Sequence, residues 1–171
     1  VVVDETYAEF RRAGTPAAHE LLAVHPHLVV ARTMSKAFGM AGLRLGYLAA
    51  SRQIVEDLQI VRLPYHLSDI TQAAALAALG HRDSLMSQIA VLRSERDALA
   101  EHLTSIGHDV ADSDANFVLF GRFEDRHAVW DSLVQRGVLI RETGPDGWLR
   151  VSVGTPEENA RFRAALNEVL S

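Results

Sequence analysis

The sequence has 171 residues, which is enough for one large hydrophobic core or two modest ones. Apolar residues make up 48% and charged residues 23%, a composition typical of soluble globular proteins, and no run approaches the roughly 20 apolar residues that a membrane span requires. The net charge of -5 disfavours a nucleic-acid partner, and the lack of cysteine excludes a disulfide framework and thiolate metal ligands.

The first half of the chain alternates between strand-like and helix-like segments, which predicts an α/β architecture. The chain opens inside an apolar run without an initiator methionine, so we expect it to be a fragment of a longer protein. Its start, VVVDETY, also lacks the charged region and cleavage site of a secretion signal, which favours the cytoplasm. The expected elements are strands at 1–3, 28–32 and 46–50, and helices at about 52–61 and 71–79, the second capped by Ser68 or Asp69.

In the second half, from Asp83 onward, leucine and isoleucine recur at helical spacing over about six turns, which predicts a long helix that bridges two domains. We therefore expect one domain at 1–82, and the bridging helix with a small α+β domain at 83–171. The expected elements after Gly107 are strands at 116–120, 138–141 and 149–153, and helices at about 125–136 and 156–170, the last with Thr155 as its N-cap.

The segment TMSKAFGMAGLRLGY, residues 33–47, contains Lys36, the only lysine in the chain. An ordinary explanation for such a residue is a stem packed on apolar neighbours with the amine in water. The alternative is a nucleophilic amine that forms an imine, which needs a desolvated setting. Thr33, Ser35 and Arg44 favour the alternative, because two hydroxyls and a fork-shaped cation can bind a phosphate. Pyridoxal phosphate requires this combination of groups.

Asp4 and Tyr7 follow the first expected strand and meet a further requirement of this cofactor. Its ring nitrogen stays protonated only when a carboxylate faces it, and Asp4 lies at a strand end, where ligands of open α/β sheets collect. Tyr7 is placed to hydrogen-bond the phenolic oxygen. Taken alone, Asp4 is equally well explained as a helix cap or loop carboxylate. Together with Lys36 at the end of a second strand, it favours a cofactor site.

VVVDETYAEF (1–10) and LVVARTMSKAFGMAGLRLGYLAA (28–50) resemble the fold-type I pyridoxal-phosphate aminotransferases. The spacing from SK to the arginine identifies this superfamily. Within it, the chain is similar to the histidinol-phosphate aminotransferase branch through VRLPYHLSDITQAAALAAL, SDANFVLF, GVLIRETG and WLRVSVGTPEEN. The resemblance implies the second half of the large cofactor-binding domain of this fold, followed by a small α+β C-terminal domain.

The resemblance also implies roles for the residues that match the cofactor site. Lys36 resembles the lysine that binds pyridoxal phosphate covalently, Asp4 the partner of the pyridine nitrogen, and Tyr7 the partner of the phenolic oxygen. The phosphate-binding positions of the family are matched by Thr33, Ser35 and Arg44.

Two arginines are implied to bind the substrates. Arg150, in WLRVSVGT, resembles the arginine that receives the substrate's anionic group, and Arg141, in VLIRETG, resembles a second arginine of the histidinol-phosphate branch. The implied reaction, a step of histidine biosynthesis in a homodimer, exchanges glutamate and 2-oxoglutarate with histidinol phosphate and imidazole acetol phosphate. The histidines at 19, 25 and 27 lack metal-like spacing, so no metal is expected.

One departure from the family affects the expected activity. The family's N-terminal arm, its glycine-rich loop, a ring-stacking aromatic residue and an asparagine would all precede Val1, so we expect the chain alone to be inactive. Two alternatives stay open. One is a different reaction on the same cofactor, such as an aromatic aminotransferase or a decarboxylase of a phosphorylated amino acid. The other is a catalytically inert half that acts only as an assembly module.

Overall fold

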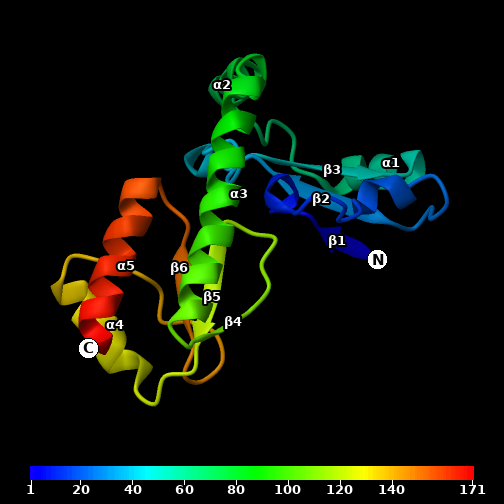
Figure 1. Cartoon of the computed structure of the whole chain (residues 1–171). Helices are drawn as coiled ribbons and strands as arrows, with labels where there is room; N and C mark the ends of the chain where they lie inside the picture. The colour runs from blue at the N-terminus through cyan, green and yellow to red at the C-terminus, as the bar shows by residue number, and fades with distance from the viewer. The chain divides into compact units, whose positions relative to one another are not determined.

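The computed structural model describes residues 1–171 and separates into two compact units, Val1–Ile89 (unit 1) and Ala90–Ser171 (unit 2). The division falls inside α3 (Arg82–Ser105), a 24-residue helix that continues from one unit into the next (Figure 1). The functional assignment of residues 1–82 and 83–171 as two domains stays a prediction. None of the helices combines the length and the apolar character needed to cross a membrane.

Unit 1 contains a three-stranded sheet in the order β1-β2-β3. β1 (Val2–Asp4) runs parallel to β2 (Val29–Thr33), which runs antiparallel to β3 (Gly46–Ala50). Valine favours these strands because β-branched side chains fit the pleated backbone. β1 is at the edge of the sheet, with Val1 and Val2 exposed. Since β1 and β2 are parallel, the residues that follow them leave the sheet at the same end.

Short 3-10 helices lie between the strands of this sheet. They are η1 (Ala8–Phe10) and η2 (Ala18–Leu21) between β1 and β2, and η3 (Ala41–Leu43) between β2 and β3. Phe10 and Ala17 are buried and anchor the first connection. Sequence analysis does not predict these helices, because turns of three or four residues leave no periodic pattern.

Two α-helices follow β3 and confirm the expected ones. They are α1 (Arg52–Val61) and α2 (Asp69–Gly80). Of the two candidate caps for α2, Ser68 is the one observed, because its hydroxyl accepts a hydrogen bond from the N–H of Thr71 at 3.1 Å. Asp69 lies in the first turn, where a negative charge is favourable.

Unit 2 contains a second three-stranded sheet, entirely antiparallel, in the order β4-β5-β6. Its strands are β4 (Asp109–Val110), β5 (Phe117–Gly121) and β6 (Leu149–Ser152). Helices α4 (Arg126–Gln135) and α5 (Pro156–Leu170) lie against each other beside it (Figure 1). This arrangement is the small α+β domain that the sequence predicts.

One hydrophobic core holds unit 2 together. Leu99 and Leu103 are four residues apart on α3, so they fall on one face of the helix, and both are fully buried. Phe120 of β5 meets Phe162 of α5 edge to face, with ring centroids 5.9 Å apart. Further members of this core are Val118, Leu133, Ile140, Leu149, Val151, Val153 and Leu166.

The start of α5 confirms the expected N-terminal signal. The hydroxyl of Thr155 accepts from the N–H of Glu158 at 3.3 Å, and the carboxylate of Glu158 accepts from the N–H of Thr155 at 2.8 Å. This reciprocal capping box satisfies two backbone donors that the helix leaves unpaired. Pro156 occupies the first turn, where its missing N–H is harmless.

The prediction of a strand at 138–141 is wrong. This segment pairs with the neighbouring chain only through Arg141, as an isolated bridge. The N–H of Val138 instead donates to a carbonyl at the end of α4 at 2.9 Å, and the indole N–H of Trp130 donates to the carbonyl of Ile140 at 2.9 Å. Because α4 uses these backbone groups, a regular ladder does not form. β4, which is two residues long, is absent from the sequence-based prediction.

Candidate active site

Asp4 and Thr33 lie at the ends of two adjacent parallel strands. β1 ends at Asp4, which pairs with Ala31 in the register, and β2 ends at Thr33. Both residues are therefore at the C-terminal edge of the sheet, where open α/β sheets bind ligands. The Asp4 carboxylate is exposed, and its Oδ1 accepts hydrogen bonds from the hydroxyl of Thr6 and, at 2.9 Å, from the N–H of Thr6. These bonds orient the carboxylate and leave Oδ2 for a ligand.

A turn after β2 presents Lys36 to solvent. Met34 and Ala37, on either side of it, are buried and anchor the turn, whereas Lys36 is exposed. The N–H of Ser35 donates to the hydroxyl of Thr33 at 3.1 Å, which tightens the backbone between them. The turn thus gathers two hydroxyls and an amine within four residues. The desolvated setting that an imine-forming amine requires is not formed by these residues alone.

Tyr7 lies beside the Lys36 side chain. The Nζ of Lys36 is 5.8 Å from the centroid of the Tyr7 ring, a distance at which a cation is attracted to an aromatic face. The ring also contacts buried Phe10, with centroids 6.5 Å apart and planes at 56°. These contacts bring the segment after β1 next to the turn after β2.

Arg44 has an unusual backbone conformation. It ends η3 in the left-handed region, with φ 52° and ψ 41°, which is uncommon for a residue other than glycine. Its side chain is exposed and donates from Nη1 to the carbonyl of Ala41 at 3.3 Å. Left-handed non-glycine residues concentrate at ligand sites, where the surrounding structure maintains the strain. Gly46, the first residue of β3, pairs with Thr33, the last residue of β2. Arg44 therefore lies just before β3, at the end of the sheet where β2 ends.

Glu5 and Arg32, the chain neighbours of Asp4 and Thr33, form an ion pair that is absent from the sequence-based predictions. Burial alone would raise the pKa of Glu5, but hydrogen bonds from Arg32 and from the N–H of Ala18 hold that pKa below its ordinary value of 4.5. Burial would likewise lower the pKa of Arg32, but its hydrogen bond to Glu5 raises that pKa above its ordinary value. Both groups are therefore charged at neutral pH. The sequence contains one sign of this ion pair, which is a charged residue directly beside each of the two expected site residues.

Arg141 and Arg150 face each other in unit 2. Each donates its backbone N–H to the other's carbonyl at 2.9 Å, so their side chains leave the same face of the paired chains. The guanidinium of Arg150 lies 4.7 Å from the ring centroid of Phe117, and its buried Nε has no hydrogen-bond partner. Both arginines line a pocket of about 320 Å³ together with Leu139, Ile140 and Ser152. Two cations at one pocket suit an anionic ligand.

The expected site residues therefore form two sets. One set is held by the strand ends and turns of unit 1, and the other by the paired segment of unit 2. The first set consists of Asp4, Tyr7, Thr33, Ser35, Lys36 and Arg44, and the second of Arg141 and Arg150.

Similarity to known proteins extends over almost the whole chain. The family model for aminotransferase class I and II matches residues 1–166. A histidinol-phosphate aminotransferase of Thermobifida fusca is 66% identical over 166 residues, which are 97% of this chain and 45% of that protein. A histidinol-phosphate aminotransferase 3 of Burkholderia lata is 58% identical over 171 residues, which are 100% of this chain and 46% of that protein.

Solved structures give the same result for the fold. The histidinol-phosphate aminotransferase of Sinorhizobium meliloti, solved in complex with pyridoxal-5'-phosphate, matches with a TM-score of 0.85 and 30% identity, over 99% of this chain and 48% of that one. This chain thus spans about half the length of the relatives that it matches. It has the fold-type I aminotransferase architecture, and it belongs to the aminotransferase class I and II family.

Proposed function

We propose that the full-length protein transfers an amino group between glutamate and 2-oxoglutarate on one side and histidinol phosphate and imidazole acetol phosphate on the other. Pyridoxal phosphate is the cofactor of this proposal. The observation that carries it is Lys36, the sole lysine, presented beside Tyr7 at the edge of the sheet where Asp4 ends β1. The names of the relatives described above support the choice of substrates.

The donor groups of unit 1 fit pyridoxal phosphate. A carboxylate with one oxygen left for a ligand suits a protonated ring nitrogen, and an exposed amine suits an aldehyde carbon. The hydroxyls of Thr33 and Ser35 and the guanidinium of Arg44 are the donors that a phosphate dianion prefers. These groups come from the two strand ends and the turns that follow them, so one ligand can meet them together.

Each residue has a defined task in the proposed reaction. When bound, pyridoxal phosphate supplies an electron-poor ring that accepts the negative charge left at the substrate's α-carbon. Lys36 would hold the cofactor through Nζ, and as a free amine it would act as the general base that removes the proton from the substrate's α-carbon. Asp4 accepts the hydrogen bond of the protonated ring nitrogen, and Tyr7 donates to the phenolic oxygen.

The remaining residues bind anions. Thr33, Ser35 and Arg44 would hold the cofactor phosphate in one place, so that the reacting end of the cofactor can move while the phosphate end stays fixed. Arg150 and Arg141 bind the carboxylate of glutamate or the phosphate of histidinol phosphate, since the paired guanidinium groups suit either anion. A homodimer in the cytoplasm completes the proposal, and the family resemblance supports the homodimer.

Lys36 provides the decisive test. Borohydride reduction of the full-length protein with pyridoxal phosphate should attach the cofactor to the peptide that contains Lys36, the only lysine within residues 1–171. Peptide mass spectrometry identifies the labelled residue. Lys36→Ala should bind the cofactor without trapping it and should not turn over. A label that is absent from this peptide in the unmodified protein would remove Lys36 from the site.

Three measurements separate the alternatives. Release of carbon dioxide from a phosphorylated amino acid, with no keto product from glutamate, would replace transamination by decarboxylation. A full-length protein that shows no visible absorbance band with pyridoxal phosphate would instead support an inert assembly module. Turnover of aromatic amino acids in preference to histidinol phosphate would move the protein to another branch of the family.

A further inference from the structure

The Glu5–Arg32 ion pair joins the ends of β1 and β2. The carboxylate Oε2 of Glu5 accepts from Arg32 twice, at 3.0 Å from Nε and at 2.7 Å from Nη2. The side chains are largely buried, with 11% of Glu5 and 21% of Arg32 exposed. A guanidinium that donates twice fixes both the distance and the orientation of its partner. The pair thus holds the two strand ends at one separation.

The pair lies on the opposite face of the sheet from the expected site. Successive side chains in a strand point to opposite faces, so Glu5 and Arg32 project away from the face of Asp4 and Thr33. The N–H of Glu5 donates to the carbonyl of Ala31 at 2.8 Å, so the ladder continues one residue past β1. Neither charged group therefore touches a ligand that Asp4 and Thr33 hold, but both act on the strands that carry those residues.

Further segments converge on this pair. The other carboxylate oxygen of Glu5, Oε1, accepts from the N–H of Ala18 at 2.6 Å, and Nη2 of Arg32 lies 3.2 Å from Nδ1 of His19. Tyr47 of β3 is directly opposite Arg32 in the register, and its side chain contributes to the raised pKa of the Arg32 guanidinium. The ion pair therefore links β1, β2, β3 and η2, and loss of either partner would release several contacts at once.

We propose that Glu5 and Arg32 are positioning residues, which hold the carboxylate of Asp4 at a fixed place relative to Thr33 and Lys36. This inference rests on the proposed function, since the roles of Asp4 and Lys36 come from it. Displacement of a reacting group by about 1 Å can cost roughly 100-fold in rate. Loss of the pair therefore lowers kcat much more than it changes KM, although neither residue contacts the substrate.

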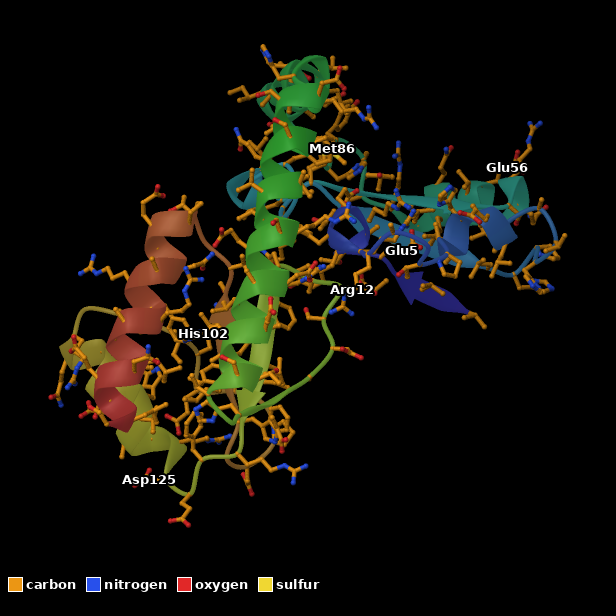
Figure 2. The ribbon with its side chains drawn as sticks, viewed as in Figure 1. Glu5, Arg12, Glu56, Met86, His102 and Asp125 are labelled. Atoms are coloured by element: carbon orange, nitrogen blue, oxygen red, sulfur yellow. The ribbon has the colours of Figure 1, made fainter.

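The test uses the full-length protein with pyridoxal phosphate, three single variants, and the double variant that combines Glu5→Gln with Arg32→Lys. Glu5→Gln removes the negative charge, and Arg32→Lys keeps the positive charge but cannot donate the forked pair of bonds. Glu56→Gln is the matched control, because it breaks an ion pair with Arg52 at the same 2.7 Å on the exposed surface of α1. Figure 2 labels both Glu5 and Glu56. The measurements are kcat, KM, the pH midpoint of the cofactor's visible absorbance, and the urea midpoint of unfolding.

Glu5→Gln and Arg32→Lys should each lower kcat about 10- to 100-fold, with KM changed less than about threefold. Each should also shift the pH midpoint of the visible absorbance by about half a unit or more, because the charge of Asp4 then lies elsewhere relative to the cofactor. The double variant should lose little more than either single variant, since both remove the same contact. Glu56→Gln should match the parent in every measurement.

A lowered urea midpoint with unchanged kcat and absorbance would overturn the inference and leave the pair a purely structural one. If Glu5→Gln does not fold, Tyr47→Phe carries the same test, because it removes only the hydroxyl of the residue opposite Arg32, at a half-exposed position. It should shift the absorbance midpoint in the direction seen for Arg32→Lys, and an unshifted midpoint would count against the inference. If the parent protein binds no pyridoxal phosphate, the proposed function falls too, whereas normal binding with unaffected variants removes this inference alone.

Discussion

At the scale of single residues, Arg141 and Arg150 differ in ways that predict different tasks. Arg150 is fixed by the ring of Phe117 and has a buried Nε, whereas Arg141 is exposed at the rim of the same pocket. A fixed guanidinium suits a clamp used by every substrate, and an exposed one can reach a larger ligand. We therefore propose that Arg150 binds the anionic group of each substrate in turn, and that Arg141 contributes mainly to binding the phosphate of histidinol phosphate.

Substitution by lysine tests this assignment, since lysine keeps the charge but loses the planar fork. Arg150→Lys should lower kcat/KM for glutamate and for histidinol phosphate alike, by about 2 to 4 kcal/mol or roughly 30- to 1000-fold. Arg141→Lys should harm histidinol phosphate more than glutamate. Steady-state kinetics with both substrates provide the measurement. Equal and small losses for Arg141→Lys would place this residue outside the site and weaken the histidinol-phosphate assignment.

His127 and Glu142 form a pH-dependent contact in unit 2. Nδ1 of His127 lies 2.9 Å from the Glu142 carboxylate, and this hydrogen bond raises the pKa of His127 above 6.5 and lowers that of Glu142 below 4.5. The stabilisation from His127 is complete below the pKa of the unfolded chain and is lost as the pH rises through the folded pKa. That from Glu142 is lost as the pH falls through its own lowered pKa. The contact is therefore strongest between these two limits.

Proton NMR of the His127 imidazole tests this contact. Its titration midpoint should lie above 6.5 in the parent protein and return toward 6.5 in Glu142→Gln, because the acceptor charge is gone. Glu157→Gln, an exposed carboxylate in the first turn of α5, is the control and should leave the midpoint unchanged. Identical midpoints in Glu142→Gln and the parent would show that the bond does not persist in solution.

At the scale of elements, local signals predicted best where they do not depend on partners. β3, α1 and α5 have their expected bounds, because the apolar run of β3, the periodicity of α1 and the Thr155 cap of α5 are encoded within each segment. The prediction of a strand at 138–141 failed because the backbone groups of this segment bond to α4 rather than to a strand. The Glu5–Arg32 pair was missed for a related reason, since its partners are 27 residues apart and meet only through the register of β1 and β2.

The same reasoning applies to the candidate site. Identities and spacing within 33–47 sufficed to select Lys36 and its phosphate donors. They could not predict that Lys36 is exposed, because burial depends on segments that are distant in the chain. The pairing of Arg141 with Arg150 was predictable from the intervening Gly and Pro, which favour a reversal of direction.

The capping box of α5 allows a stability prediction at this scale. Thr155→Ala should lower the free energy of unfolding by about 1 kcal/mol, because it leaves the N–H of Glu158 without its acceptor. Trp130 and Trp148 are the only tryptophans and both belong to unit 2, so their fluorescence in urea follows the unit that contains α5.

Thr104→Ala is the control for the capping variant. It removes the same side chain from α3, where the hydroxyl bonds to the carbonyl of Ala100 at 2.9 Å. Such bonds inside a helix contribute little to stability, so this variant should unfold close to the parent. Equal shifts in the two variants would mean that the cap contributes nothing specific.

At the scale of the whole molecule, apolar side chains are distributed unequally between the two units. The main core, with members from Leu99 to Leu166, belongs entirely to unit 2. Most of the exposed large apolar side chains belong to unit 1, among them Ile60, Leu63 and Tyr65. Composition cannot predict such a contrast, because 48% apolar residues describes the average of both units. Unit 2 therefore has the stronger basis for independent folding.

The edge position of β1 has a practical consequence for producing this chain by itself. Val1 and Val2 are 87% and 70% exposed, and the outer side of the strand offers main-chain donors and acceptors to any extended segment that meets it. Val2–Asp4 contains neither lysine nor proline, which commonly protect such edges. A second copy can add its own β1 there, and each addition presents a new edge. The isolated chain is thus open to strand addition at this edge, however well unit 2 folds.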